Sequence, residues 1–121
     1  MGKIQRFTDL EVWRRSHTLF LQILKDIEHL PNTRAATVLC DQILRSIGSI
    51  GGNVSEGFNR SKKKYLSSLD IAVGEAAETE NWLYKLRDTG VITADTACLR
   101  IRECIAIQKM LHGLIKSISN K

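Results

Sequence analysis

The chain has 121 residues and a mass of 13.6 kDa, a length that predicts a single domain over residues 1–121. Its hydrophobic content of 43% and its single proline are typical of a globular protein rich in helix and argue against a disordered chain. The net charge of +5 and the pI near 9.3 argue against an acidic surface and favour a polyanionic partner.

From Val12 onward, apolar or small residues recur at steps of three and four, which predicts a first helix with one buried face. That face consists of Val12, Ser16, Leu19, Ile23, Ile27 and Leu30. Pro31 and Asn32 end this helix, and Thr33 or Asn32 is expected to cap a second one. The buried face of the second helix consists of Leu39, Ile43, Ile47, Ile50 and Val54. Gly57 is expected to end it in the left-handed conformation.

Ser61 is the expected N-cap of a third helix, which ends at Gly90. Its buried face consists of Tyr65, Leu69, Ala72, Ala76, Thr79, Leu83 and Leu86. Thr93 or Asp95 opens a fourth helix, whose buried face consists of Ile101, Cys104, Gln108, Leu111, Ile115 and Ile118. Four helices of about 22 to 28 residues with short connections predict an all-α fold, an up-down-up-down antiparallel four-helix bundle.

Three glycines in the second helix, Gly48, Gly51 and Gly52, interrupt an otherwise regular pattern. Relative to alanine they cost about 2 to 3 kcal/mol in total, so they need a compensating role. We interpret Gly48 and Gly52, four residues apart, as a surface that lets a neighbouring helix approach closely. A phosphate-binding loop is not expected, because no Gly-Lys-Ser/Thr follows and no strand is predicted before the glycines.

A polar stripe runs along the second helix beside its apolar face and consists of Gln42, Arg45, Ser49, Asn53 and Glu56. If the second and third helices pair antiparallel, Arg45 lies level with Glu75 and an ion pair between them is expected. Glu56 is expected near Arg60 and Lys64, and Asn53 is expected to form a hydrogen bond across the helix pair. We interpret these residues as groups that orient helices or subunits, in preference to catalytic groups.

A basic cluster, Arg60, Lys62, Lys63 and Lys64, stands at the predicted start of the third helix, and Tyr65 follows it directly. Free backbone N–H groups and the helix dipole attract anions at the same place, so these residues are the candidate phosphate contacts and Tyr65 is the candidate base-stacking residue. The alternative interpretation is a solvated basic loop. The cations that can extend this surface are Arg14, Arg15, Arg100, Arg102 and Lys109.

The residues that enzymes and metal sites require do not form a known pattern. His17, His29 and His112 lie in no Glu-x-x-His sequence and in no Arg-His arrangement of helical ribonucleases, so we expect no enzyme, no metal and no cofactor. Three cysteines without a Cys-x-x-Cys pair indicate reduced core residues: Cys40, Cys98 and Cys104. Charges near the start and the lack of a long apolar run predict a soluble, cytoplasmic protein without membrane contact.

Five segments of the chain together suggest a family: "FTDLEVW" (7–13), "QILRSI" (42–47), "NVSEG" (53–57), "RSKKKY" (60–65) and "LDIAVGEAAE" (69–78). In these segments the chain resembles the four-helix-bundle proteins encoded in 23S ribosomal RNA intervening sequences. The resemblance implies a bundle, commonly a ring of five, and a distant relationship to the accessory proteins of diversity-generating retroelements, which bind nucleic acid and a reverse transcriptase. It implies no enzymatic activity. Lys64 stands where family members often carry an acidic residue, which makes this cluster more basic.

These observations lead to one main hypothesis: a non-catalytic, oligomeric bundle that binds RNA or DNA through the turn between the second and third helices. The alternative is a scaffold that binds another protein and uses its basic residues for solubility or docking; a ribonuclease is the least favoured. We expect a homo-oligomer, by resemblance a pentamer, to which Trp13, Phe20 and Trp82 contribute apolar contacts.

Overall fold

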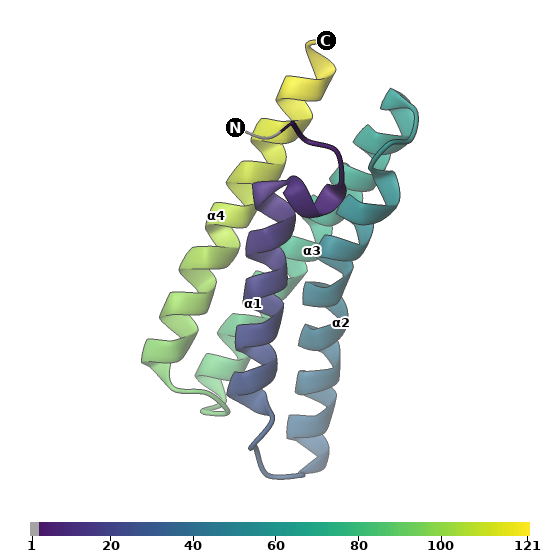
Figure 1. Ribbon diagram of the computed structural model, residues 1–121. Helices are drawn as coiled ribbons and strands as arrows, with labels where there is room; N and C mark the ends of the chain where they lie inside the picture. The colour runs from purple at the N-terminus through teal and green to yellow at the C-terminus, as the bar shows by residue number, and fades with distance from the viewer. Residues whose placement is uncertain (1–2) are drawn as a thin grey trace.

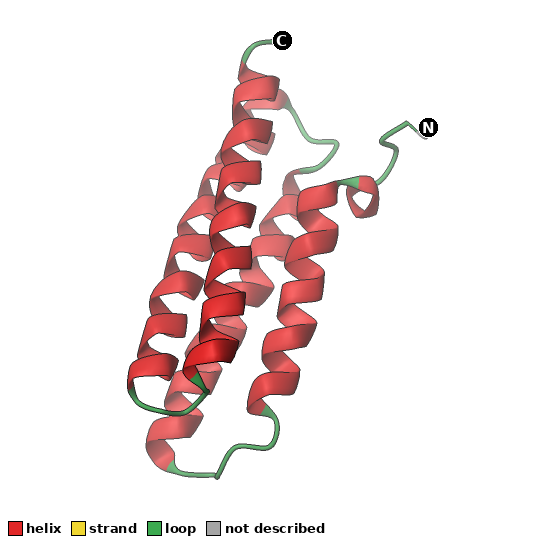
Figure 2. Ribbon diagram, turned by 90° about the vertical axis from the view of Figure 1, so that its left-hand side faces the viewer, coloured by secondary structure: helices red, strands yellow, loops and turns green. Residues whose placement is uncertain are grey.

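The computed structural model describes residues 3–121, and its helices form an antiparallel up-down-up-down bundle (Figure 1). The elements are a short 3-10 helix η1 (Phe7–Asp9) and the helices α1 (Glu11–Ile27), α2 (Arg34–Gly57), α3 (Lys62–Asp88) and α4 (Ala94–Ser119). Helix is the only regular structure in the described part of the chain (Figure 2). The predicted all-α bundle is therefore confirmed. None of the helices within residues 3–121 has the length and apolar character that crossing a membrane requires.

The helices start where the sequence predicts, because hydroxyl side chains accept the first free backbone N–H groups. Thr33, Ser61 and Thr93 each accept a hydrogen bond from the backbone nitrogen three residues on, at 3.2, 3.3 and 3.2 Å. Gly90 follows α3 with a φ of 76°, a left-handed conformation that glycine adopts without strain. These caps fix the lengths of the connections.

Two expectations about helix ends are wrong. The first helix has 17 residues instead of the expected 22 or more, because η1 occupies the segment before it and α1 ends at Ile27. Gly57 is the last residue of α2, and the left-handed residue of the turn is Asn59, with a φ of 64°. Asparagine tolerates this conformation better than most residues do.

The glycines of α2 face neighbouring helices at Gly48, as predicted, and also at Gly51 and Gly57. A Cβ on Gly57 would lie 2.6 Å from Ser68 Cβ, so α3 packs against α2 at a distance that only glycine permits. Gly48 and Gly51 face α1, where a Cβ would lie 3.6 Å from Phe20 and 3.3 Å from Trp13 Nε1. Gly52 meets nothing within 4 Å, so the predicted pairing of Gly48 with Gly52 is wrong.

The core follows the predicted faces of α1 and α3, whereas on α4 the predicted Gln108, Ile115 and Ile118 are half-buried and Ile107 is buried instead. The residues of α3 from Leu69 to Leu86 that were expected inside are all buried, and so is the face of α1 from Val12 to Ile27. Thr79 is the polar exception on α3, and its hydroxyl lies 2.8 Å from the hydroxyl of buried Ser46 on α2. Buried hydroxyls paired in this way cost little, because each has a partner.

Candidate nucleic-acid interface

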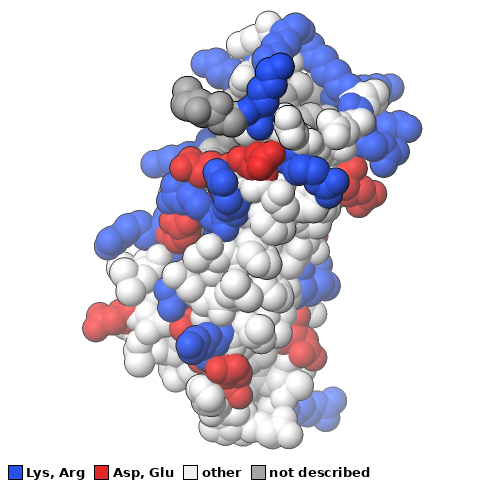
Figure 3. All heavy atoms as spheres, in the orientation of Figure 1, with Lys and Arg blue, Asp and Glu red and all other residues white. Residues whose placement is uncertain are grey.

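The charge of the protein is concentrated at one end of the bundle. This basic end comprises residues 3–14, 54–68 and 110–121, which hold nine Lys and Arg residues against three Asp and Glu residues. The rest of the chain holds nine Lys and Arg against ten Asp and Glu residues. Figure 3 shows the Lys and Arg side chains gathered around the end of the molecule where α4 finishes. The net positive charge of the protein therefore lies entirely at this end.

Three of the four predicted phosphate contacts are free at the surface. Arg60, Lys63 and Lys64 are exposed, and within residues 3–121 none of them lies within 4 Å of a carboxylate. Lys62 differs, because its ammonium group donates to the backbone oxygens of Lys121 at 2.6 Å and Ser119 at 3.4 Å. It neutralises the negative end of the α4 dipole, so its charge is partly committed to the fold.

The start of α3 adds backbone donors to these side chains. Ser61 accepts the N–H of Lys64, while the preceding N–H groups of Lys62 and Lys63 are in the first turn and have no intrahelical acceptor. Such a helix start favours anions through its dipole. Side-chain and backbone donors therefore face the same solvent region.

Tyr65 is held by the fold more firmly than a base-stacking residue requires. Its ring is half-buried and packs edge-on against Phe58 with ring centroids 6.1 Å apart. Burial raises the pKa of its hydroxyl above the ordinary value of 10.0. A Cβ on Gly57 would also touch this ring, at 3.1 Å. Tyr65 packs the turn between α2 and α3 and exposes only part of its ring.

The structure brings together cations that the sequence analysis did not group with the turn. Lys3 and Arg6 in the N-terminal segment, and Lys116 and Lys121 at the end of α4, belong to the basic end. The signal was present in the topology: in an antiparallel bundle of four helices, both termini lie at the end that carries the second connection (Figure 1). Long-range placement, not local sequence, assembles this surface.

The predicted extension along α1 and α4 is only partly available. Arg15 forms a two-point ion pair with Glu103, at 2.6 and 2.8 Å, and Arg100 forms one with Asp26, at 2.7 and 3.0 Å. Both pairs join α1 to α4. The cations of this set that remain without such a pair in the described chain are Arg14, Arg102 and Lys109.

Among the described residues, the polar stripe on α2 pairs with another helix through one side chain, that of Arg45. Arg45 lies 3.7 Å from Glu75, as predicted, and 2.6 Å from Glu78, which the sequence analysis missed. Asn53 donates to the backbone oxygen of Ser49 in its own helix, at 2.8 Å, and within residues 3–121 it forms no hydrogen bond across the helix pair, so that expectation is wrong.

Among the described residues, the remaining members of the stripe form no hydrogen bond or ion pair with another helix. Glu56 is exposed, and no ion pair joins it to Arg60 or Lys64 in the described chain. Gln42 is half-buried and donates no side-chain hydrogen bond among the described residues. Burial and the neighbouring carboxylate of Glu78 raise the pKa of Glu75 above 4.5, against the opposing effect of Arg45.

The described residues offer no metal centre or activated thiol. No cluster of three or more His, Cys, Asp or Glu side chains within residues 3–121 is arranged to hold a metal ion. Cys104 is buried with its sulfur 3.1 Å from the backbone oxygen of Ala76, and burial raises the pKa of the thiol to about 12. Burial raises the pKa of the Cys40 thiol as well.

Comparison with known proteins places these observations in a family. The model of the 23S rRNA-intervening sequence protein family matches residues 8–113. A solved structure from Bacteroides thetaiotaomicron, described as a protein with unknown function from the S23 ribosomal protein family, is 34% identical. Its TM-score is 0.80, and the alignment covers 87% of this chain and 98% of that one. No curated protein matches the chain.

Proposed function

The chain belongs to the family of 23S rRNA-intervening sequence proteins, and we propose that it is a non-catalytic protein that binds RNA or DNA through its basic end. The observation that carries the proposal is the separation of charge, with nine Lys and Arg residues against three Asp and Glu residues at one end and near neutrality elsewhere. The proposal includes a cytoplasmic location, which the free thiols of Cys40, Cys98 and Cys104 support.

Phosphate groups suit this end because three cations of its turn are exposed and form no ion pair among the described residues. Arg60, Lys63 and Lys64 form no ion pair with a carboxylate in the described chain, so no internal ion pair must break when a phosphate binds. Each phosphate they neutralise releases condensed counterions from the nucleic acid, which drives binding and makes it depend on salt. Contacts of this kind hold the backbone and do not read the sequence of bases.

Self-association is the second part of the proposal. Several large apolar side chains stand at least half-exposed: Ile4 (53%), Leu21 (50%), Val38 (52%), Ile71 (51%) and Leu99 (56%). Trp13, Phe20 and Trp82, the contacts expected from the sequence, are half-buried against the core of the single chain. A ring of five, the assembly that the family resemblance implies, would repeat the basic end around an axis and multiply its phosphate contacts. Light scattering at micromolar concentration tests this: a species of 13.6 kDa would overturn it.

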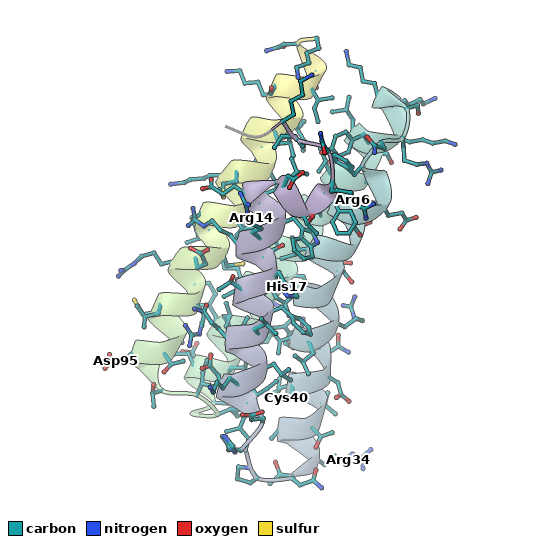
Figure 4. All side chains as sticks on the ribbon, in the orientation of Figure 1. Arg6, Arg14, His17, Arg34, Cys40 and Asp95 are labelled. Carbon is teal, nitrogen blue, oxygen red and sulfur yellow. The ribbon has the colours of Figure 1, made fainter. Side chains whose placement is uncertain are left out.

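The charge-dependent part is tested by a pair of variants that lose the same net charge. Lys63→Gln with Lys64→Gln removes two free cations from the basic end. Lys25→Gln with Arg34→Gln removes two exposed cations from elsewhere; Arg34 lies at the opposite end of the bundle (Figure 4). Lys62 is left intact because it also contacts the end of α4. Binding to a DNA or RNA duplex is measured by fluorescence anisotropy over a range of salt concentrations.

We expect the first variant to bind more weakly and to reduce the slope of log K against log salt by about one to two, since each lost phosphate contact removes about 0.9. The control variant should keep the wild-type slope. An equal reduction of affinity and of salt slope in the two variants would show that binding depends on net charge and not on the basic end. A wild-type protein that ignores both nucleic acids at low salt would favour the alternative, a scaffold whose partner is another protein.

A further inference from the structure

An aromatic groove lies between η1, α1 and α2, and neither the charge of the basic end nor the core packing accounts for it. It has a volume of about 350 Å³. The residues that line this aromatic groove are Phe7, Trp13, Ser16, His17, Phe20, Ile47, Gly48, Gly51, Gly52 and Ser55. Pockets of this volume are large enough for one small planar ligand.

The walls of the groove are flat rings in contact with one another. Trp13 and His17 are stacked with centroids 4.8 Å apart and an interplanar angle of 10°, and Phe7 meets Trp13 edge-on at 5.4 Å. His17 is exposed beside α1 (Figure 4). The facing wall is α2, where Gly48 and Gly51 lie close to the Phe20 and Trp13 rings and a Cβ on Gly52 would meet nothing within 4 Å, so the groove is open beside Gly52.

The groove continues into the basic end. Phe7 and Ser55, which line it, both belong to the segments of that end, and the guanidinium of Arg6 lies over the Phe7 ring at 5.6 Å from its centroid. Figure 4 places Arg6 above His17 along the same side of the bundle. Among the residues that line the groove none is Asp or Glu. A ligand with a planar ring and a negative charge matches this arrangement of rings below a cation.

We infer that the aromatic groove receives one unpaired base of a single-stranded nucleic acid whose phosphates lie on the basic end. This inference rests on the proposed function. Bases stack on aromatic side chains whatever their identity, whereas a base within a duplex is already paired and stacked. An apolar protein side chain would use the rings but would gain no electrostatic attraction from the guanidinium of Arg6, whereas the phosphate next to a bound base would. The protein therefore prefers single strands to duplexes.

The test fills the groove without changing charge or breaking the fold. Gly52→Leu places a side chain at a groove-lining position where a Cβ meets no atom within 4 Å. Gly74→Leu is the matched control, since its Cβ also meets nothing and Gly74 does not line the groove. Both substitutions favour helix, so both proteins should fold at least as well as the wild type. His17→Ala is a second variant that removes an exposed ring of the wall.

The probes are a short oligothymidylate, an abasic strand of the same length and a duplex. The wild type should bind the oligothymidylate about 5- to 150-fold more tightly than the abasic strand, the range that stacking of one base provides. Gly52→Leu should remove this preference and keep the affinity for the abasic strand, and His17→Ala should reduce the preference. Gly74→Leu should preserve it. In a Trp82→Phe background, only the oligothymidylate should quench the fluorescence of Trp13.

The results that overturn the inference are distinct from those that overturn the proposed function. Equal wild-type affinity for the abasic strand and the oligothymidylate, with salt-dependent duplex binding, removes the base site and leaves the basic end as a phosphate surface. If Gly52→Leu changes the oligomer mass measured by light scattering but leaves the binding of all three probes unchanged, the groove is a contact with a second copy of the chain. No binding of any probe by the wild type overturns both proposals.

Discussion

Gly57→Ala should destabilise the protein, although alanine is the better helix former. Gly57 is the last residue of α2 and is buried beneath α3. A Cβ added there lies 2.6 Å from Ser68 Cβ, 3.0 Å from Ser68 Oγ and 3.1 Å from Tyr65 Cδ1. The first of these atoms is fixed to the α3 backbone and cannot turn away, so α3 must shift. Overpacking of this kind costs about 1 to 3 kcal/mol, which exceeds the gain of up to about 1 kcal/mol in helix propensity.

The assay is urea unfolding followed by circular dichroism, with Gly74→Ala as the control. Gly74 has open space around its Cβ, so that variant should gain about 0.5 to 1 kcal/mol from propensity alone. Ser68→Gly, which removes the opposing Cβ, should relieve the cost of Gly57→Ala in a double-mutant cycle. If Gly57→Ala unfolds at the same urea concentration as Gly74→Ala, the close approach of α2 and α3 is not what requires glycine here.

Two further predictions concern charges between helices. Asp26→Ala should cost about 3 kcal/mol in the free energy of unfolding, because it leaves Arg100, whose side chain is 19% exposed, without its partner. Asp88→Ala, which breaks the exposed pair with Arg87, should destabilise the protein far less than Asp26→Ala. Glu75→Gln should stabilise the protein at neutral pH. The pKa of Glu75 is raised in the folded state, so the folded protein binds more protons than the unfolded one above pH 4.5. The free energy of unfolding of the wild type therefore falls as pH rises from there. Urea titrations at acidic and neutral pH should show a smaller decrease for the variant.

The fold was predictable because its determinants are local. Three hydroxyl residues start helices at their own sequence positions, and the three- and four-residue spacing identifies the buried face without knowledge of the partner helix. Both the hydrogen bond of an N-cap side chain and the spacing of apolar residues involve positions only a few residues apart. The exact ends were harder, because η1 and the left-handed Asn59 depend on how the chain enters and leaves the bundle.

The candidate interface was predictable only in part, because it depends on distances between helices. Lys62 looked equivalent to Lys63 in sequence, yet the end of α4 accepts its ammonium protons. Arg15 looked free, but Glu103 pairs with it from α4, 88 residues away along the chain. The general rule that antiparallel bundles collect both termini and the middle turn at one end would have found the basic end; no local rule would have found those pairings.

Packing at the turn between α2 and α3 also determines how its charges meet a ligand. The backbone nitrogen of Arg60 donates to the oxygen of Gly57 at 3.2 Å, and the Phe58 and Tyr65 rings hold the two sides of the turn together. The backbone that carries Arg60, Lys63 and Lys64 is therefore ordered before a phosphate arrives. Ordering a loop on binding would subtract from affinity, so a fixed turn retains more of the electrostatic free energy. The same glycine that admits α3 against α2 thus supports the proposed phosphate surface, and on the proposed function a change at Gly57 should weaken nucleic-acid binding as well as stability.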